Sequence, residues 1–471
     1  MEYRNESDSL GECQVPNDAY YGVQTLRAVE NFPITGIKIS QFPNLIRALA
    51  AVKKAAALAN LELGILDYDI RNAIVQACDE IRDGMLHEHF VVDVIQGGAG
   101  TSTNMNANEV IANRALEILG HERGDYKFCH PNNHVNLSQS TNDVYPTALK
   151  IASIWDIEIL LSSMNKLKDV FMVKGREFGD VLKIGRTQLQ DAVPMTLGQE
   201  FEAYAITIGE GMKALKDSTR EICGINMGAT AIGTGINTVE GYAEKVRFLL
   251  SEITGLPLYT EPNLVEATSD TGAFVQLSGV LKRIAIKLSK ICNDLRLLSS
   301  GPRAGINEIN LPPRQPGSSI MPGKVNPVIP EVVNQVCFQV IGNDITVTLA
   351  AEGGQLELNV FEPILGFNIF QSIEMMERAC TVLRERCVEG ITANREWCHK
   401  LVERSVSLIT ALAPFIGHEE AAKIANEALK SGRPVRELVL EAGVIDEDKL
   451  KDILDPHKMT HPRSITGYGK I

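Results

Sequence analysis

Two long stretches without proline constrain the fold more than any other feature of this 471-residue sequence. Residues 147–174 contain neither glycine nor proline, and residues 269–299 contain no proline. Apolar residues recur in both stretches at the spacing of one helix face, as at Leu277, Leu281 and Ile284. Helices of this length bury such a face only against partners, so the pattern predicts a helix bundle.

The rest of the chain is also expected to be mainly α-helical. Two more long helices are expected at residues 327–351 and 362–387, two shorter ones at 45–59 and 70–81, and several short ones after residue 396. Residues 20–34, with Gly22 and Pro33 as breakers, and residues 226–237 are expected to form loops, and the tail 462–471 to be unstructured. The sequence therefore predicts three domains, which are an N-terminal helical domain at 1–141, a central long-helix bundle at 142–395 and a small C-terminal helical domain at 396–471.

Charge and cysteine content exclude several classes of partner. The formal net charge of −13 and the pI near 5.3 disfavour nucleic acids and anionic membranes, which need a concentrated basic surface. The nine cysteines include no Cys-x-x-Cys pair, so neither a disulfide framework nor a zinc cluster is indicated. Residues 1–16 lack an apolar targeting segment, and no stretch has the length of a membrane span. We expect a cytoplasmic protein.

Three clusters of hydroxyl and amide residues each precede a predicted helix, at residues 96–106, 134–143 and 185–194. The first contains a glycine turn and runs into a helical pattern at 108–119. Free backbone N–H groups and the positive end of a helix dipole favour a carboxylate or phosphate at such positions. An ordinary helix cap is the alternative interpretation. Neither of the common nucleotide-binding glycine patterns is present, which disfavours a nucleotide site.

A fourth polar stretch, residues 317–327, reads Gly-Ser-Ser-Ile-Met-Pro-Gly-Lys-Val-Asn-Pro. Gly317 and Gly323 permit backbone angles closed to other residues, whereas Pro322 and Pro327 fix φ and remove two donors. The segment cannot be a regular helix or strand. It is expected to be a loop over an active site, with an ordinary Gly/Pro turn as the alternative.

Taken together, the motifs resemble those of the aspartase/fumarase superfamily, lyases that release fumarate. The resemblance is carried by Gly-Ala-Gly-Thr-Ser-Thr-Asn-Met-Asn-Ala-Asn-Glu from Gly98, Ser-Gln-Ser-Thr-Asn-Asp from Ser138, Gly-Arg-Thr-Gln-Leu-Gln-Asp from Gly185, and the stretch from Gly317. The details look most like the aspartases, which interconvert L-aspartate with fumarate and ammonia. The resemblance implies a homotetramer with a shared helix-bundle core, active sites built from three subunits, and no required cofactor, although some members are activated by Mg²⁺.

The resemblance also implies the site residues. Ser318 matches the general base, which removes the proton next to the β-carboxylate and leaves an aci-carboxylate that neutral donors stabilise. The donors implied are Thr101, Ser140, Thr141 and Ser319. The α-carboxylate would be held by Lys324 and Asn326, and the amine surrounded by Thr101, Asn142 and Gln188. Thr187 and Met321 complete the substrate-binding set.

Two assignments have explicit alternatives. A serine hydroxyl is a very weak acid, so Ser318 needs several converging donors to act as a base, and a histidine such as His134 is the other candidate. Fumarases carry histidine at the position of Gln188, and a neutral amide suits an ammonium leaving group better. A class II fumarase is therefore the second reading, and an inactive structural relative the third, although the intact motifs argue against it.

Overall fold

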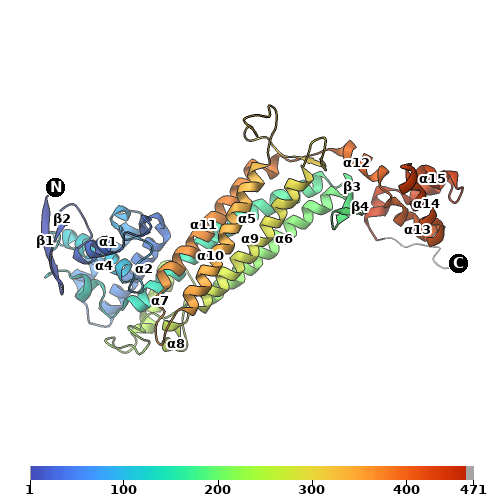
Figure 1. Ribbon diagram of the computed structural model, residues 1–471. Coiled ribbons are helices and arrows are strands. Elements are labelled where there is room, and N and C mark those ends of the chain that lie inside the picture. The colour runs from blue at the N-terminus through green and yellow to red at the C-terminus, as the bar shows by residue number, and fades with distance from the viewer. Residues whose placement is uncertain (1, 463–471) are drawn as a thin grey trace. The chain divides into compact units, whose positions relative to one another are not determined.

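The computed structural model describes residues 2–462 and is mainly α-helical, which confirms the expected fold class (Figure 1). Two compact units divide the chain: residues up to 162 with 213–285 and 338–377, and residues 163–212 with 286–337 and those from 378 onward. Five long helices contribute a segment to each unit, namely α5 (Thr141–Glu177), α6 (Leu197–Ile222), α9 (Gly272–Leu298), α10 (Val328–Glu352) and α11 (Glu362–Arg386). The division into domains 1–141, 142–395 and 396–471 stays a prediction. Residues 463–471 of the expected tail lie outside the described residues.

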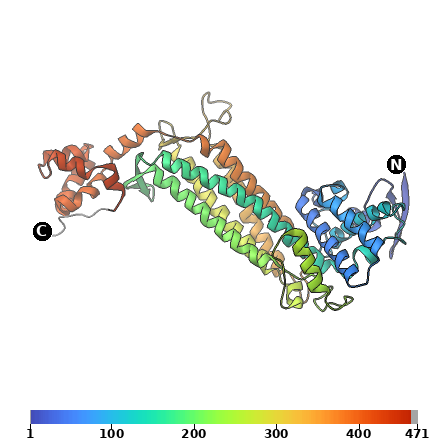
Figure 2. The same ribbon diagram turned by 180° about the vertical axis from the view of Figure 1, so that it is seen from behind.

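The long helices confirm the bundle expected from the proline-free stretches. Leu277, Leu281 and Ile284 are all buried on α9. Within the first unit, Ser278 of α9 donates a hydrogen bond to Asp344 of α10 (2.8 Å). In both views the segments of these helices in each unit run side by side (Figures 1 and 2). None of the helices in residues 2–462 combines the length and apolar character that a membrane crossing requires.

The first unit surrounds its part of the bundle with shorter elements. They are β1 (Tyr3–Asp8), β2 (Gly11–Pro16), α1 (Val23–Asn31), α2 (Pro43–Glu62), α3 (Tyr68–Arg82), α4 (Thr101–Ile118), β5 (Gly224–Ile225), α7 (Tyr242–Thr254), β6 (Tyr259–Thr260) and α8 (Leu264–Ser269), with 3-10 turns at Ile39–Gln41 and His87–His89 and a π-helical turn at Pro131–Val135. The alanine-rich helix α2 packs against α3 and α7. This confirms the two helices expected after Pro43.

Two expectations for the first unit were wrong at their boundaries. Residues 20–34 contain helix α1, because the buried Glu109 carboxylate accepts the N–H groups of Gly22, Gln24 and Thr25 at 2.8–3.1 Å and so caps the helix from a distant part of the chain. Helix α4 begins at Thr101, not at residue 108. Its polar first turns become helical because their amides find buried partners.

The second unit adds a small sheet and the C-terminal helices. Its elements are β3 (Leu182–Thr187), β4 (Gln190–Thr196), β7 (Ile309–Asn310), β8 (Thr392–Ala393), α12 (Arg395–Arg404), α13 (Leu408–Ile416), α14 (His418–Ser431), α15 (Val435–Glu441), α16 (Glu447–Ile453) and α17 (Pro456–Thr460), with a 3-10 turn at Val388–Gly390. The rings of Phe171 on α5 and of Phe178 just after it pack against Phe201 and Tyr204 of α6. The short helices after residue 396 are confirmed, but residues 185–194, expected as a loop, form most of the antiparallel β3–β4 hairpin.

Candidate functional site

The predicted site residues form two groups, one in each unit. The first unit contains Thr101, Ser140, Thr141 and Asn142. The second contains Thr187, Gln188, Ser318, Ser319, Met321, Lys324 and Asn326. Each group is described separately below.

Thr101 is the first residue of α4 and follows a left-handed glycine turn. Gly98 and Gly100 both have φ of 90°, and a Cβ on Gly100 would lie 2.3 Å from the Tyr145 ring, so this position accepts only glycine. The exposed Thr101 hydroxyl donates its proton to the Gly98 carbonyl at 2.7 Å. Its lone pairs are therefore left for a donor outside the turn.

Ser140 directly precedes α5, and Thr141 and Asn142 are its first residues, where Asp143 fixes the backbone. The buried Asp143 carboxylate accepts the N–H groups of Ser140 (2.9 Å), Gly228 (3.2 Å) and Thr230 (3.0 Å). Burial is the largest cause that raises the pKa of Asp143, to about 6, and these hydrogen bonds act against it. Asp143 thus ties the α5 start to the loop at 226–237.

Asn142 lies beside a proline that interrupts the helix ladder. Pro146 has no N–H for the carbonyl four residues earlier, and Asn226 Nδ2 donates to this Asn142 carbonyl instead at 3.0 Å. The Asn142 side chain donates through Nδ2 to the Ala231 carbonyl at 2.7 Å. This bond leaves Asn142 Oδ1 as an acceptor. Because of this proline, α5 was expected to start at residue 147, whereas it begins at Thr141.

Thr141 is hydrogen-bonded to a network of buried side chains. Lys53 is fully buried, and its Nζ donates to Asn136 Oδ1 and Gln139 Oε1, both at 2.9 Å. Asn104 Nδ2 donates to Asn136 Oδ1 at 3.1 Å and to Thr141 Oγ1 at 3.0 Å. Desolvation lowers the pKa of Lys53 to about 7. Sequence reasoning missed Lys53 as a site component, although its place among the apolar residues of α2 was a usable signal.

The stretch from Gly317 to Asn326 is a loop, as expected, and is closed by two bonds across its base. The Gly317 N–H donates to the Lys324 carbonyl at 2.7 Å, and Asn326 Nδ2 donates to the Gly317 carbonyl at 2.7 Å. Ser318 Oγ accepts the N–H groups of Ile320 (3.2 Å) and Met321 (3.1 Å). Two of the converging donors that a serine base requires are therefore present.

Most of the side chains that follow Ser318 in this loop are exposed. Ser319, Met321 and Lys324 are all exposed, and Asn326 is half-buried. Within the part of the chain that the structure describes, the Lys324 ammonium makes no ion pair. Its charge is thus available to an anionic ligand.

Thr187 and Gln188 lie at the tip of the β3–β4 hairpin and are exposed. Gln188 and Leu189 form the two-residue turn with φ of 54° and 63°. Along β3, Arg186 pairs with the buried Glu308 at 2.7 Å, and Lys183 pairs with Glu308 at 3.1 Å. Sequence reasoning did not foresee this anchor, because Glu308 is distant in the chain.

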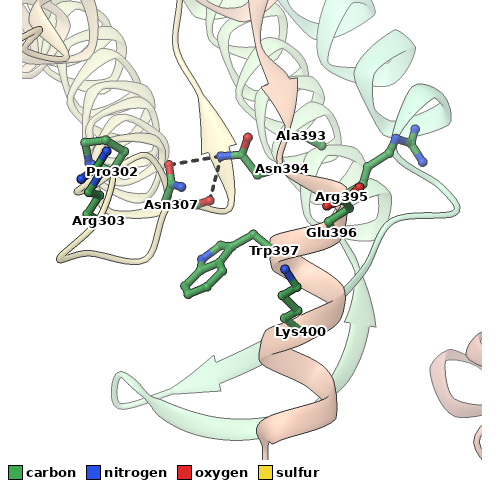
Figure 3. Close-up of a pocket in the computed structure, with 9 residues that line it drawn as sticks. All are labelled: Pro302, Arg303, Asn307, Ala393, Asn394, Arg395, Glu396, Trp397 and Lys400. Carbon is green, nitrogen blue, oxygen red and sulfur yellow. Dashed lines mark hydrogen bonds between the residues drawn. The ribbon is translucent and has the colours of Figure 1, made fainter.

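A separate pocket of about 620 Å³ lies in the second unit, and none of the predicted site residues lines it (Figure 3). Its walls include Arg303, Asn394, Trp397 and Lys400. Trp397 Nε1 donates to the Ile306 carbonyl at 2.7 Å, and Asn394 Nδ2 donates to Asn307. The side chains that the motifs single out therefore do not belong to this cavity.

The described residues show no group of three or more His, Cys, Asp or Glu side chains placed to hold a metal ion. The nine cysteines form no disulfide in residues 2–462. The chemistry available at the two groups is that of hydroxyls, amides and one exposed ammonium. Such groups bind and stabilise carboxylates.

Comparison with known proteins defines the class. A family model described as "Lyase" matches residues 11–342, and one described as "Fumarase C C-terminus" matches residues 408–461. Among solved structures, a fumarate lyase:delta crystallin from Brucella melitensis bound to cobalt is 59% identical with a TM-score of 0.96, covering 98% of this chain and 100% of that one. A class II fumarase from Schistosoma mansoni is 36% identical with a TM-score of 0.93, with the same coverage. The chain has the fold of the aspartase/fumarase superfamily of lyases.

Similarity to curated relatives narrows the class. An aspartate ammonia-lyase from Pseudomonas aeruginosa is 61% identical over 463 residues, which is 98% of each chain. The chain therefore belongs to the aspartate ammonia-lyase family, whose members are carbon–nitrogen lyases.

Proposed function

We propose that this protein catalyses the reversible deamination of L-aspartate to fumarate and ammonia. The observation that carries the proposal is the hydrogen-bonding polarity of the first group. The lone pairs of Thr101 and Asn142 Oδ1 are left to accept, whereas Ser140 and Thr141 already accept hydrogen bonds and are left to donate. Acceptors match an ammonium and donors match a carboxylate, and aspartate carries both.

Donors at the β-carboxylate drive the elimination. When the proton leaves the carbon next to this carboxylate, the electron pair enters it and forms a doubly charged aci-carboxylate. Neutral hydroxyls held in place bind this species more strongly than the substrate, and such differential binding lowers the barrier. Ser140, Thr141 and Ser319 would take this role, with the α-carboxylate held by Lys324 and Asn326. The electron pair then forms the double bond of fumarate, and ammonia leaves.

Ser318 is proposed as the general base that takes the proton. The N–H groups of Ile320 and Met321 point at its oxygen, as needed to stabilise an alkoxide. The alternative base, His134, lies in the π-helical turn, where its Nδ1 accepts the N–H of His130 at 2.8 Å. Burial also lowers the pKa of His134. These features favour Ser318.

Gln188 would hydrogen-bond the leaving amine together with Thr101 and Asn142, and Thr187 and Met321 would line the remaining substrate surface. A neutral amide cannot take a proton but can accept one of the ammonium hydrogens in a hydrogen bond. This chemistry, with the higher identity to an aspartate ammonia-lyase than to a class II fumarase, ranks deamination above hydration. An inactive structural relative is disfavoured because the motif hydroxyls and Lys324 are all present.

We propose further that the protein is a cytoplasmic homotetramer whose active sites are shared between subunits, and that it requires no cofactor. On α10, Phe338, Ile345 and Leu349 expose 61%, 60% and 64% of their surface within one chain. Their spacing places them on one helix face, and a second copy of the chain would cover it. Light scattering tests the assembly, and a fully active monomer would contradict it. Assays with EDTA and with added Mg²⁺ test the cofactor proposal and metal activation.

The reaction is tested by ultraviolet detection of fumarate from L-aspartate and, separately, from L-malate. We expect turnover of L-aspartate and little or no turnover of L-malate. Faster turnover of malate would reverse the ranking of the two lyases, and no turnover of either would support the inactive relative.

A further inference from the structure

The hydroxyl of Thr141 ends a chain of buried side chains whose hydrogen-bonding roles are all determined. We propose that Lys53, Asn136 and Asn104 are positioning residues that occupy a lone pair of this hydroxyl and so direct its proton to the ligand. The proposal rests on the proposed function, in which Thr141 binds the β-carboxylate. It assigns a role to three residues that would not touch the substrate.

Lys53 determines the first step. An ammonium donates hydrogen bonds and accepts none, so both side chains that it contacts must present oxygen. Its partners are Asn136 Oδ1 and Gln139 Oε1. Even the neutral amine has two N–H groups for these two acceptors, so a lowered pKa of Lys53 does not change the assignment.

Asn136 carries the assignment to the next residue. Its Oδ1 accepts from Lys53, from Asn104 at 3.1 Å and from Asn108 at 3.1 Å, while its Nδ2 donates to the Gln139 carbonyl at 3.1 Å. The reversed amide would place NH₂ against the Lys53 amine, which has only donors to offer here, and oxygen against the Gln139 carbonyl. Asn136 therefore has one possible orientation.

Asn104 then fixes Thr141. Because Asn104 faces the oxygen of Asn136, it must present its NH₂ group, and the other hydrogen of this group points to Thr141 Oγ1 at 3.0 Å. Thr141 must accept this bond. In residues 2–462 its own proton has no other partner, so it is left for a ligand oxygen. Asn104 is 1% exposed and Thr141 9%, so water does not readily replace these bonds.

The consequence is a direction of charge preference. A hydroxyl with one lone pair occupied and its proton still free favours an anion over an ammonium. Turning the Thr141 hydroxyl so that its proton points away from the ligand should weaken stabilisation of the aci-carboxylate more than ground-state binding. The reason is that the negative charge on this carboxylate grows in the transition state.

The test compares Asn104→Asp with Asn104→Leu. The aspartate has the same shape but can only accept, so Thr141 must turn its proton inward. The leucine leaves the hydroxyl free to rotate. We expect Asn104→Asp to lower kcat/KM for L-aspartate by on the order of 10²-fold, mostly in kcat, and Asn104→Leu by less than about 10-fold.

Asn108→Asp is the matched control. It places the same negative charge next to the same acceptor, Asn136 Oδ1, but Asn108 has no hydrogen bond to Thr141. We expect Asn108→Asp to lose at least about 10-fold less kcat/KM than Asn104→Asp. Equal losses in the two aspartate variants would overturn the proposal, because the effect would then come from added charge. Thermal unfolding of each variant checks the fold.

A double-mutant cycle completes the test. In the Thr141→Val background no hydroxyl remains to be reversed. Adding Asn104→Asp should therefore lower kcat/KM by less than about 3-fold further. If Asn104→Asp does not fold, Asn136→Leu replaces it. This variant frees Asn104 to reverse, and we expect about a 10-fold loss of kcat/KM that disappears in the same background. If the wild type turns over L-aspartate and the effects of the two substitutions on kcat/KM are fully additive, the polarity proposal alone is overturned. A wild type without turnover overturns the proposed function.

Discussion

The buried polar cluster of Lys53, Asn136 and Asn104 that contacts Thr141 differs from the loop around Ser318 in how it holds a hydroxyl. In the cluster, buried amides and Lys53 hold a hydroxyl in one orientation. In the loop, exposed residues surround a serine whose bonds come from backbone N–H groups two and three residues ahead. The proposed binding hydroxyl of Thr141 is thus held by the folded core, whereas the proposed base lies on a segment whose contacts are local.

The difference suggests where conformational change can occur. Altering the cluster means breaking several buried hydrogen bonds, each with a large desolvation penalty. Altering the loop breaks only the bonds between Gly317 and Lys324 and between Asn326 and Gly317, together with the turn at Ser318. We expect the loop to close over a bound dicarboxylate and the cluster to stay unchanged.

Ser318→Ala should have the largest effect, because it removes the proposed base but no proposed carboxylate donor. We expect kcat for L-aspartate to fall by about 10³- to 10⁴-fold while the dissociation constant of succinate changes little. Ser319→Ala, the neighbouring hydroxyl, should weaken succinate binding and retain more of kcat. A Ser318→Ala enzyme that keeps its kcat and loses succinate affinity would assign the loop a binding role and erase the contrast.

Lys324→Met removes the one charge that the loop offers to the ligand and keeps much of the side-chain length. We expect kcat/KM to fall by about 10²- to 10³-fold with an unchanged thermal unfolding midpoint, because the exposed ammonium contributes to binding and not to the fold. Steady-state kinetics and scanning calorimetry measure the two quantities. Near-normal turnover would mean that another group holds the α-carboxylate.

Alanine substitutions at the two loop glycines distinguish the effect of a steric clash from the effect of backbone strain. A Cβ on Gly317 would lie 2.5 Å from the Lys324 carbonyl oxygen, so Gly317→Ala must open the base of the loop. Gly323 has φ of 82° with no atom within 4 Å of an added Cβ, so Gly323→Ala adds only backbone strain. We expect kcat/KM to fall by roughly 30-fold in Gly317→Ala and about 5-fold in Gly323→Ala. The reverse order would show that the closed base is irrelevant.

The last prediction concerns how the buried amine of Lys53 makes stability depend on pH. The pKa of Lys53 is lowered to about 7 in the folded chain and returns to its ordinary value on unfolding, so unfolding takes up a proton above pH 7. Stability should therefore rise from pH 7 to 9 by on the order of 2 kcal/mol relative to Lys53→Met. The pKa values of the facing groups, Asp143 at about 6 and Cys78 raised well above its usual range, lie outside this window. Urea unfolding at both pH values measures the difference, and parallel curves would contradict it.

Much of the fold could be predicted because helix periodicity is a local property. The ends of α9 were expected within three residues, and those of α10 and α11 within one. What local pattern could not predict was structure that depends on distant partners. Helix α1 starts where Glu109 caps it, and the hairpin at 185–194 is anchored by Glu308.

The candidate site follows the same division. Every proposed ligand-binding residue lies in a motif that resemblance could identify, and its place in the sequence needed no coordinates. The roles of Lys53 and Asn136 were out of reach, because a helix pattern indicates that a position is buried but not what its side chain meets. Donor and acceptor assignments appear only when the partners are known.

The turn at Gln188 and Leu189 bears on how such an enzyme can change its chemistry over evolutionary time. Both residues already adopt the left-handed backbone region, where histidine and asparagine are tolerated better than most residues. A substitution at the tip can therefore replace the group proposed to meet the departing amine without rebuilding the hairpin, whose strand β3 Glu308 holds through Lys183 and Arg186. The fold separates the residue proposed to select the leaving group from the residues that hold the hairpin, so we expect a change of specificity to need only this exposed position.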